Sequence, residues 1–142
     1  MRERRHGTIV NISSISAQTC PAGSGYYLAS KAALESMTAA LRKEVGPLGI
    51  TAMVVEPGGF RIDFAGRSLQ QAGVAIDTAG RRRKENDKTH GHQPGDPARA
   101  AQAIIATVES AEPPSLLLLG EGRRSVLPLD PRGTVPLTVF PA

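Results

Sequence analysis

A short stretch near the start of the chain, "NISSISAQTCPAGSGYYLASK" (residues 11–31), combines serines, two adjacent tyrosines and a lysine. Tyr27 and Lys31 are four residues apart, so they share one face if this segment is helical. The unperturbed pKa of a phenol is about 10, but a nearby ammonium favours the phenolate and lowers that pKa. Tyr27 would then exchange a proton near neutral pH, while the Ser14 hydroxyl would bond a substrate oxygen. The same pair also fits an ordinary helix with a packed ring and an exposed amine.

The elements around this stretch predict a strand, a helix and a second strand. Residues 7–13, "GTIVNIS", form a compact β-branched run that is typical of a strand buried on both faces. A helix is predicted from Ser24 or Gly25 to the Gly46-Pro47 pair, where glycine suits a left-handed cap. Residues 50–57, "ITAMVVEP", predict a second buried strand, parallel to the first. The predicted apolar face of the helix consists of Leu34, Met37, Leu41 and Val45.

Three features of this region occur together. "TIVNISS" covers most of the first strand, and "VVEPGGF" covers the end of the second strand. Between them, Tyr27 follows Ser14 by thirteen positions and begins "YLASK", a form of the pattern Y-x-x-x-K. In this order they resemble the short-chain dehydrogenase/reductase (SDR) family, over roughly residues 1–120. "VEPGGFRIDF" and "QPGDPARAAQAI" are most similar to its bacterial members related to 17β-hydroxysteroid and retinol dehydrogenases. The resemblance implies an α/β fold, the C-terminal half of a doubly wound Rossmann-type domain with about three parallel strands and crossover helices.

The resemblance also implies roles for individual residues. Tyr27 would be the general acid/base, Lys31 would tune it and bond the nicotinamide ribose, and Ser14 would orient the substrate oxygen. Pro57 and Gly58 would line the nicotinamide pocket, beside Tyr27 and Lys31. The implied cofactor is NAD or NADP, and the implied substrate is a small alcohol/carbonyl pair. The tyrosine-bearing helix usually forms dimers in this family, so self-association through it is expected.

The sequence departs from the family pattern at the cofactor site. A dinucleotide fold needs a strand, a glycine-rich turn and a helix in close succession. Gly23-Ser24-Gly25 continues with Leu28 and follows its strand at too great a distance, so no phosphate-binding motif is recognised. Ile62 stands where the family usually has a threonine that bonds the carboxamide, and the family's catalytic asparagine belongs to the half that is not recognised. We therefore expect a truncated form that lacks the dinucleotide-binding half.

Two functional hypotheses follow from this departure. The first is an NAD(P)-dependent oxidoreductase represented by its catalytic half. The second is a non-catalytic remnant, or an interaction or dimerisation module, that keeps the motif without a cofactor site. Within residues 1–120 we predict a catalytic strand–helix–strand unit at 7–58, a substrate lid at 60–95, and a last helix and strand at 96–119. Asp96 and Pro97 mark the start of that helix, as N-cap and first helical residue. Residues 121–142 contain four prolines and predict an irregular tail.

The composition of the chain argues against several other classes of function: membrane-spanning, nucleic-acid-binding and metal-binding proteins. The chain has 142 residues, a net charge of +4 and no apolar run long enough to span a membrane. Its basic clusters, at residues 2–5 and 81–84, have no interleaved aromatic residues, so we interpret them as solvated charge rather than a nucleic-acid site. Cys20 is the only cysteine, and a reducing cytoplasm is the expected compartment. His90 and His92 lie in a polar segment without a third ligand, so no metal site is expected.

Overall fold

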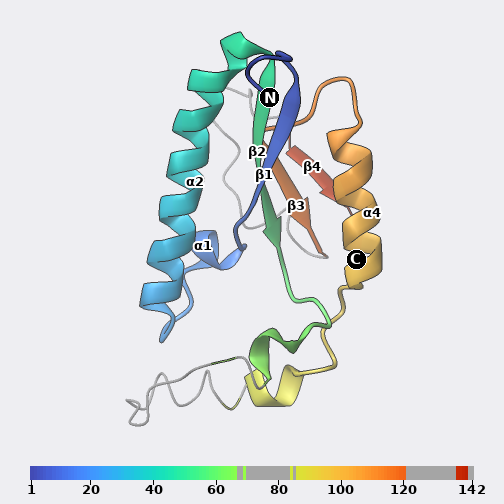
Figure 1. The fold of residues 1–142 in the computed structure, drawn as a ribbon. Coiled ribbons are helices and arrows are strands. Elements are labelled where there is room, and N and C mark those ends of the chain that lie inside the picture. Colours follow the sequence, from blue (N-terminus) through green and yellow to red (C-terminus); the bar gives the residue numbers. More distant parts are fainter. Residues whose placement is uncertain (67–68, 70–83, 85, 121–136, 141–142) are drawn as a thin grey trace.

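The sheet of the protein is parallel throughout. A computed structural model describes residues 1–66, 69, 84, 86–120 and 137–140. In this part of the chain four strands form one sheet in the order β1-β2-β3-β4, and every neighbouring pair is parallel (Figure 1). The predicted α/β class with parallel strands is therefore confirmed. The strands are β1 (Gly7–Ile12), β2 (Ile50–Pro57), β3 (Leu116–Leu119) and β4 (Leu137–Phe140).

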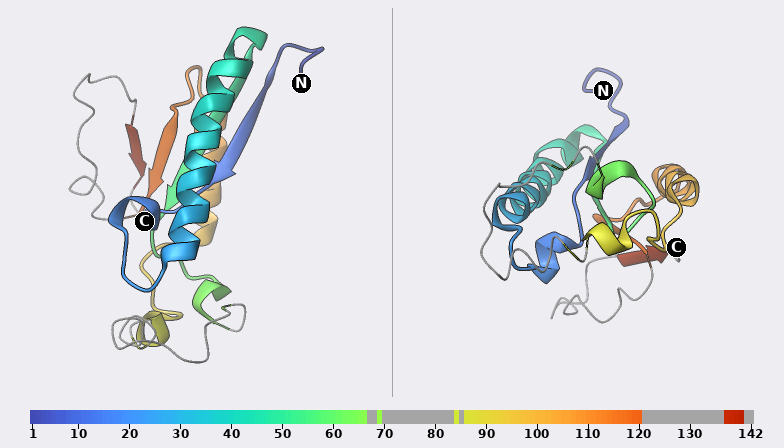
Figure 2. Two further views of the ribbon diagram at one scale, coloured as in Figure 1. Left: turned by 90° about the vertical axis from the view of Figure 1, so that its left-hand side faces the viewer. Right: turned by 90° about the horizontal axis from the view of Figure 1, so that it is seen from below.

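Two long helices cover opposite faces of this sheet. The helix α2 (Gly25–Val45) lies on one face and α4 (Pro97–Val108) on the other, as the two views of Figure 2 show. This is the arrangement that an open parallel sheet requires, because both of its faces are apolar and must be covered. The shorter helical segments are α1 (Ser16–Thr19), η1 (Gly46–Leu48) and η2 (Asp63–Ala65).

The main apolar core lies between the sheet and α4. Side chains alternate along a strand, so every second residue of β2 and β3 points to this face. The partly buried residues that pack against this core come from β1 and α4: Val10, Ala100, Ala103, Ile104 and Val108. The buried members come from β2, β3 and the segment after β2: Met53, Val55, Phe60, Leu117 and Leu119.

The first strand is less buried than its sequence predicts. β1 lies at one edge of the described sheet and pairs with β2 alone. Its residues are half-buried, and the side chain of Ile12 is 44% exposed. The expectation of a strand buried on both faces was therefore wrong for β1. It is correct for β2, which lies between β1 and β3 and has six buried residues.

The start of α2 at Gly25 confirms the predicted boundary, but two details of this helix differ from expectation. Met37, expected in the apolar face, is 66% exposed, and its neighbour Thr38 is buried. Gly46 has a right-handed backbone (φ −52°) and continues into η1. The left-handed glycine is Gly49 (φ 71°), because the Pro47-containing turn of 3₁₀-helix comes between the end of α2 and the reversal of the chain.

The segment after residue 120 contains a strand that the sequence did not predict. Leu137–Phe140 form β4, paired in parallel with β3 from Leu116↔Leu137 to Leu119↔Phe140. The prediction of an irregular tail was wrong for these four residues. β4 is an edge strand that fits between Pro136 and Pro141, and prolines are tolerated at the ends of such strands. Residues 121–136 and 141–142 lie outside the described residues.

The core on the α4 side predicts a clear stability difference between two apolar truncations. Leu117 is fully buried, so Leu117→Ala should lower the free energy of unfolding by about 2–5 kcal/mol. Ile105, on α4, is 56% exposed, and Ile105→Ala should change the free energy of unfolding by less than about 0.5 kcal/mol. Urea unfolding followed by circular dichroism measures both values. Equal losses for the two variants would contradict this description of the core.

Candidate active site

The two adjacent tyrosines face different environments because neighbouring residues of a helix point about 100° apart. Both lie in the first turn of α2. Tyr26 is 99% exposed, whereas Tyr27 is half-buried against the protein. Their adjacency in sequence therefore brings only Tyr27 to the protein side of the helix.

Lys31 connects Tyr27 to the end of the first strand. Its Nζ lies 5.7 Å from the centroid of the Tyr27 ring, a distance at which the ammonium and the ring attract each other. The same Nζ donates a hydrogen bond to the carbonyl oxygen of Ile12, at 2.9 Å. Since Ile12 is the last residue of β1, Lys31 fixes the first turns of α2 against the carboxyl end of that strand.

Phe64 also contacts the Tyr27 ring. The two ring centroids are 5.5 Å apart and the planes are inclined by 53°, which is a favourable aromatic arrangement. Phe64 belongs to η2, in the segment after β2. Sequence reasoning missed this residue. The available signal was its place shortly after the Pro57-Gly58 loop in a chain with only three phenylalanines.

Ser14 lies in the turn between β1 and α1 and is 8% exposed. Its Oγ accepts a hydrogen bond from the backbone N–H of Ser16, at 3.1 Å. The next residue, Ile15, donates its backbone N–H to the carbonyl oxygen of Pro57 at 3.2 Å, so this turn lies against the end of β2. Among the hydrogen bonds of the described residues, none joins the Ser14 hydroxyl directly to Tyr27.

Pro57 and Gly58 lie at the same edge of the sheet. Pro57 is the last residue of β2, and the backbone N–H of Gly58 donates to the carbonyl oxygen of Leu119 at 2.9 Å, at the end of β3. Figure 1 shows α1 and the first turns of α2 beside the carboxyl ends of the strands. All five residues predicted for the site, Ser14, Tyr27, Lys31, Pro57 and Gly58, therefore belong to this edge, where open parallel sheets bind their ligands.

A polar cluster around one buried carboxyl group lies next to these residues and was not predicted. Glu56, at the end of β2, is 1% exposed. The side-chain amide of Gln18, on α1, donates to Glu35 Oε2 at 3.0 Å and to Glu56 Oε1 at 3.2 Å. The Ser13 hydroxyl donates to the other oxygen of Glu35. Burial, and then the charge of Glu35, raise the pKa of Glu56 to about 7. The signal in the sequence was a single ionisable residue in the apolar run "VVEP".

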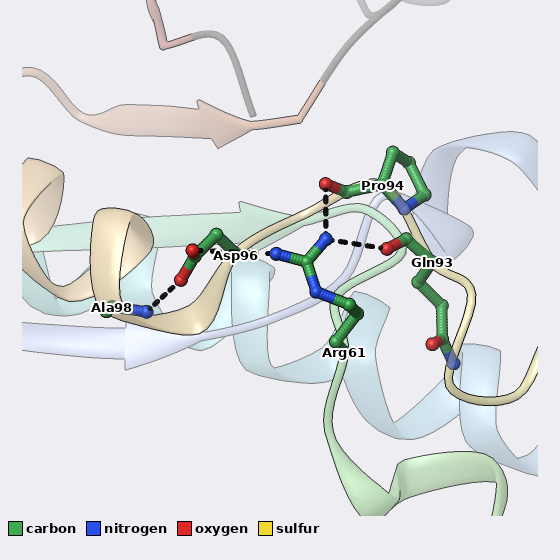
Figure 3. Close-up of polar contacts among 5 residues, drawn as sticks. All are labelled: Arg61, Gln93, Pro94, Asp96 and Ala98. Carbon is green, nitrogen blue, oxygen red and sulfur yellow. Dashed lines mark hydrogen bonds and ion pairs between the residues drawn. The ribbon is translucent and has the colours of Figure 1, made fainter.

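A second polar cluster connects the two ends of the segment predicted to be a lid (Figure 3). Arg61 donates from Nη1 to the carbonyl oxygens of Gln93 and Pro94, at 3.0 and 2.9 Å, and its Nη2 lies 3.5 Å from Asp96 Oδ2. Asp96 Oδ1 accepts from the backbone N–H of Ala98 at 2.8 Å, which confirms the predicted N-cap. At Gly95 an added Cβ would lie 2.5 Å from the Phe60 ring, so the two ends of the segment approach too closely for a larger residue.

Within the predicted lid at 60–95, residues 67–68, 70–83 and 85 lie outside the described residues. His90 and His92 are exposed, and His90 Nε2 lies 3.8 Å from Asp63 Oδ1. The part of the chain that the structure describes contains no group of three potential metal ligands. Nor does any helix in that part have the length and apolar character to cross a membrane.

The basic clusters and the cysteine considered from the sequence make no contact with the predicted site residues in any hydrogen bond of the described residues. Residues 2–5 are exposed, and Arg5 donates to the carbonyl oxygen of Pro47. Most of the second basic cluster, residues 81–83, lies outside the described ranges. Cys20 is an exposed free thiol at the C-terminal end of α1.

A parallel sheet with helices on both faces, and with a tyrosine–lysine pair at the carboxyl ends of its strands, defines a protein of the doubly wound α/β class. The particular family follows from comparison: residues 1–73 match the model of the short chain dehydrogenases. The chain belongs to that family.

Three similar proteins illustrate the relationship. The chain is 31% identical to oxidoreductase BOA17 of Botryotinia fuckeliana, over 84% of this chain and 45% of that protein. It is 34% identical to carbonyl reductase family member 4 of Danio rerio, over 85% of this chain and 46% of that protein. The crystal structure of a short-chain dehydrogenase from Streptomyces avermitilis matches with a TM-score of 0.70 and 39% identity, over 85% of this chain and 45% of that one. The chain thus spans about half the length of these relatives.

The cluster around Asp96 allows its capping role to be separated from its ion pair. Asp96→Ala should lower the free energy of unfolding by about 1 kcal/mol, because the first turn of α4 loses its cap. Asp96→Asn keeps a capping oxygen and removes the charge, so it should restore most of the loss. Its ion pair with Arg61 is exposed, and such pairs contribute about 0–1 kcal/mol. Thermal unfolding measures the two variants, and equal losses would assign the stabilisation to the ion pair instead.

Proposed function

We propose that this chain carries the proton-transferring part of an NAD(P)-dependent oxidoreductase that interconverts an alcohol and a carbonyl compound. The observation that supports it most directly is the contact between Lys31 and Tyr27 at the carboxyl edge of the sheet, with Lys31 anchored on the Ile12 carbonyl oxygen. Membership of the short chain dehydrogenase family supports the same assignment, as do relatives named as an oxidoreductase and a carbonyl reductase.

In this proposal Tyr27 moves the proton. In the reducing direction its hydroxyl donates a proton to the substrate carbonyl oxygen, and in the oxidising direction the phenolate takes that proton back. The positive charge of Lys31 stabilises the phenolate through space. The Ser14 hydroxyl, whose oxygen already accepts from Ser16, has its own proton left to donate to the substrate oxygen as negative charge develops there.

The residues at this edge fit the nicotinamide end of the cofactor. An ammonium has three N–H donors, and Lys31 uses one of them on Ile12, so others remain for ribose hydroxyls. Gly58 lacks a side chain at the end of β2, so that backbone atoms there can approach a flat ring closely. When bound, the nicotinamide supplies or accepts the hydride at the carbon of the substrate.

A second candidate function, self-association, is supported by the outer face of α2. A stripe of exposed residues follows this helix at spacings of three or four, and it includes the most exposed aromatic and methionine side chains of the described residues. This outer stripe consists of Tyr26, Ala29, Ala33, Met37 and Ala40. Small residues between two large apolar ones allow a second helix to approach closely. We propose that a second copy of the chain packs here, which would give a dimerisation role even to a chain without catalytic activity.

Substitution of each tyrosine tests the proton-transfer role. Tyr27→Phe removes only the hydroxyl, so NADH- or NADPH-dependent turnover of a carbonyl substrate should fall by about 10²–10⁴-fold. Binding of NADH or NADPH, followed by fluorescence titration, should change little. Tyr26→Phe is the matched control and should leave turnover unaltered, since that side chain points to solvent. Full turnover in Tyr27→Phe would remove Tyr27 from its role. Failure of the wild-type chain to bind either dinucleotide would favour the non-catalytic alternative.

Charge placed on the outer stripe tests self-association. For the wild-type chain we expect the mass measured by analytical ultracentrifugation to increase with concentration. Met37→Asp should abolish this increase, because burying an ionised carboxylate against a second apolar stripe costs free energy. Ala32→Asp is the control: Ala32 is exposed on the same helix but about a third of a turn from the centre of the stripe. A wild-type chain that stays monomeric at all concentrations would refute this second candidate.

A further inference from the structure

Glu56 occupies an unusual position for a carboxyl group. It is 1% exposed at the end of β2, a strand whose preceding residues are apolar. Its Oε1 accepts a single hydrogen bond, from Gln18, and its Oε2 has no hydrogen-bond partner within the described residues. A buried carboxylate needs several donors to compensate for the loss of water, and Glu56 has one. The geometry therefore favours the neutral, protonated form of this side chain.

Glu35, the neighbouring carboxyl, has the opposite environment. It accepts from the Ser13 hydroxyl at one oxygen and from the Gln18 amide at the other, which suits an ionised group that only accepts. Two ionised carboxylates that share one amide, one of them buried, would repel each other. The arrangement of donors thus assigns the negative charge to Glu35 and the proton to Glu56. In agreement, burial and the charge of Glu35 raise the pKa of Glu56.

Gln18 transmits this arrangement to the turn that carries Ser14. Both of its bonds come from one side-chain nitrogen, so the amide joins α1 to α2 and to β2 at the same time. α1 has only four residues, and its first residue, Ser16, is the one whose backbone N–H bonds Ser14 Oγ. A short helix has little stability of its own, so its position depends on such tethers. Movement of Gln18 would therefore displace the N–H that orients the Ser14 hydroxyl.

We propose that Glu56, carrying a proton, is a positioning residue: together with Glu35 it holds Gln18, and through α1 it fixes the turn that presents Ser14. The relevance of Ser14 to catalysis rests on the proposed function, whereas the tether itself does not. The groups around Glu56 come from each neighbouring segment: Ser13 from the turn after β1, Gln18 from α1, Glu35 from α2, and Leu118 from β3 by register. Glu35 is the ionisable one among them.

The sign of the pH dependence follows from the proton count. The pKa of Glu56 is about 7 in the folded chain and 4.5 in the unfolded reference, so between these values the folded state holds more protons. Its contribution to stability is therefore complete below about pH 4.5 and is lost as the pH rises towards 7. Above that range Glu56 is ionised next to Glu35, and the two carboxylates compete for Gln18. We expect the α1 tether to loosen there.

Nuclear magnetic resonance of the labelled 142-residue chain tests this proposal directly. The carboxyl carbon of Glu56 should titrate with a midpoint near pH 7 rather than near 4.5. The backbone amide of Ser16 and the side-chain amide of Gln18 should shift with the same midpoint. A Glu56 midpoint near 4.5, or a Ser16 amide that does not respond across the Glu56 titration, would overturn the proposal.

Three variants separate the tether from general effects of pH. Glu56→Gln mimics the protonated acid, so Ser16 should keep its low-pH signal up to pH 8.5. Gln18→Ala should remove the connection between Glu56 and α1. The carboxyl carbon of Glu56 should still titrate, but the backbone amide signal of Ser16 should no longer shift with it. Glu44→Gln makes the same chemical change at an exposed position of α2 and should leave the Ser16 titration unaltered. If Glu56→Gln does not fold, Gln18→Ala still decides, because continued response of Ser16 in that variant would refute the tether.

These measurements use no cofactor and no substrate. A chain that fails to bind NADH or NADPH would contradict the proposed function and leave the titration of Ser16 untouched. A Ser16 amide without a response to Glu56 would contradict the tether and leave cofactor binding and the role of Tyr27 untouched.

Discussion

The parallel pairing of β1 with β2 is the constraint on which the rest of the site depends. The register runs from Gly7↔Ile50 to Ile12↔Val55, and the backbone N–H of Ser13 extends it to the Val55 carbonyl oxygen at 2.7 Å. Because the strands are parallel, the crossover must carry the chain back along the sheet. α2 has 21 residues, about 30 Å at ~1.5 Å per residue, which is the length that this return needs. Its first turns consequently lie at the carboxyl ends of both strands.

The two faces of the sheet are held to their helices by different interactions, apolar burial on one face and hydrogen bonds on the other. On the α4 face the core cluster consists of apolar side chains, and their burial supplies the main driving force for folding. On the α2 face, buried polar groups are paired across the interface. Asn11 donates to the Thr38 hydroxyl at 2.8 Å, and Thr38 donates to the Leu34 carbonyl oxygen at 2.7 Å. Arg42 donates to the Ala52 carbonyl oxygen at 2.9 Å. Such directional bonds fix how far α2 lies along the sheet, and this position sets where Tyr27 and Lys31 end up.

Elements with strong local signals were predictable from the sequence. β2 begins and ends where its apolar run does, and Asp96 with Pro97 marks the start of α4. Properties that depend on distant residues were not. Met37 was assigned to the wrong side of α2, because a helix rich in alanine leaves its buried face weakly marked, and the burial of Thr38 depends on Asn11 as its partner. The exposure of β1 depends on which strands flank it, and β4 depends on pairing with β3.

The candidate site shows the same division between local and distant information. The spacing of Tyr27 and Lys31 is local, so their shared face could be predicted from the helix alone. Phe64 reaches the Tyr27 ring from another element, and no periodicity connects the two. Glu56 was missed for a different reason: one carboxyl in an apolar strand could point to either face. Only the three-dimensional structure shows that the Glu56 carboxyl group meets Gln18, which also binds Glu35.

The contacts that hold the proposed proton-transfer groups all come from within this chain. Lys31 is held by Ile12, the Tyr27 ring by Phe64 and Lys31, and the Ser14 turn by Ser16 and Pro57. None of them requires a residue from a dinucleotide-binding motif. The geometry of the acid/base group and the affinity for a cofactor are therefore separable properties of this fold.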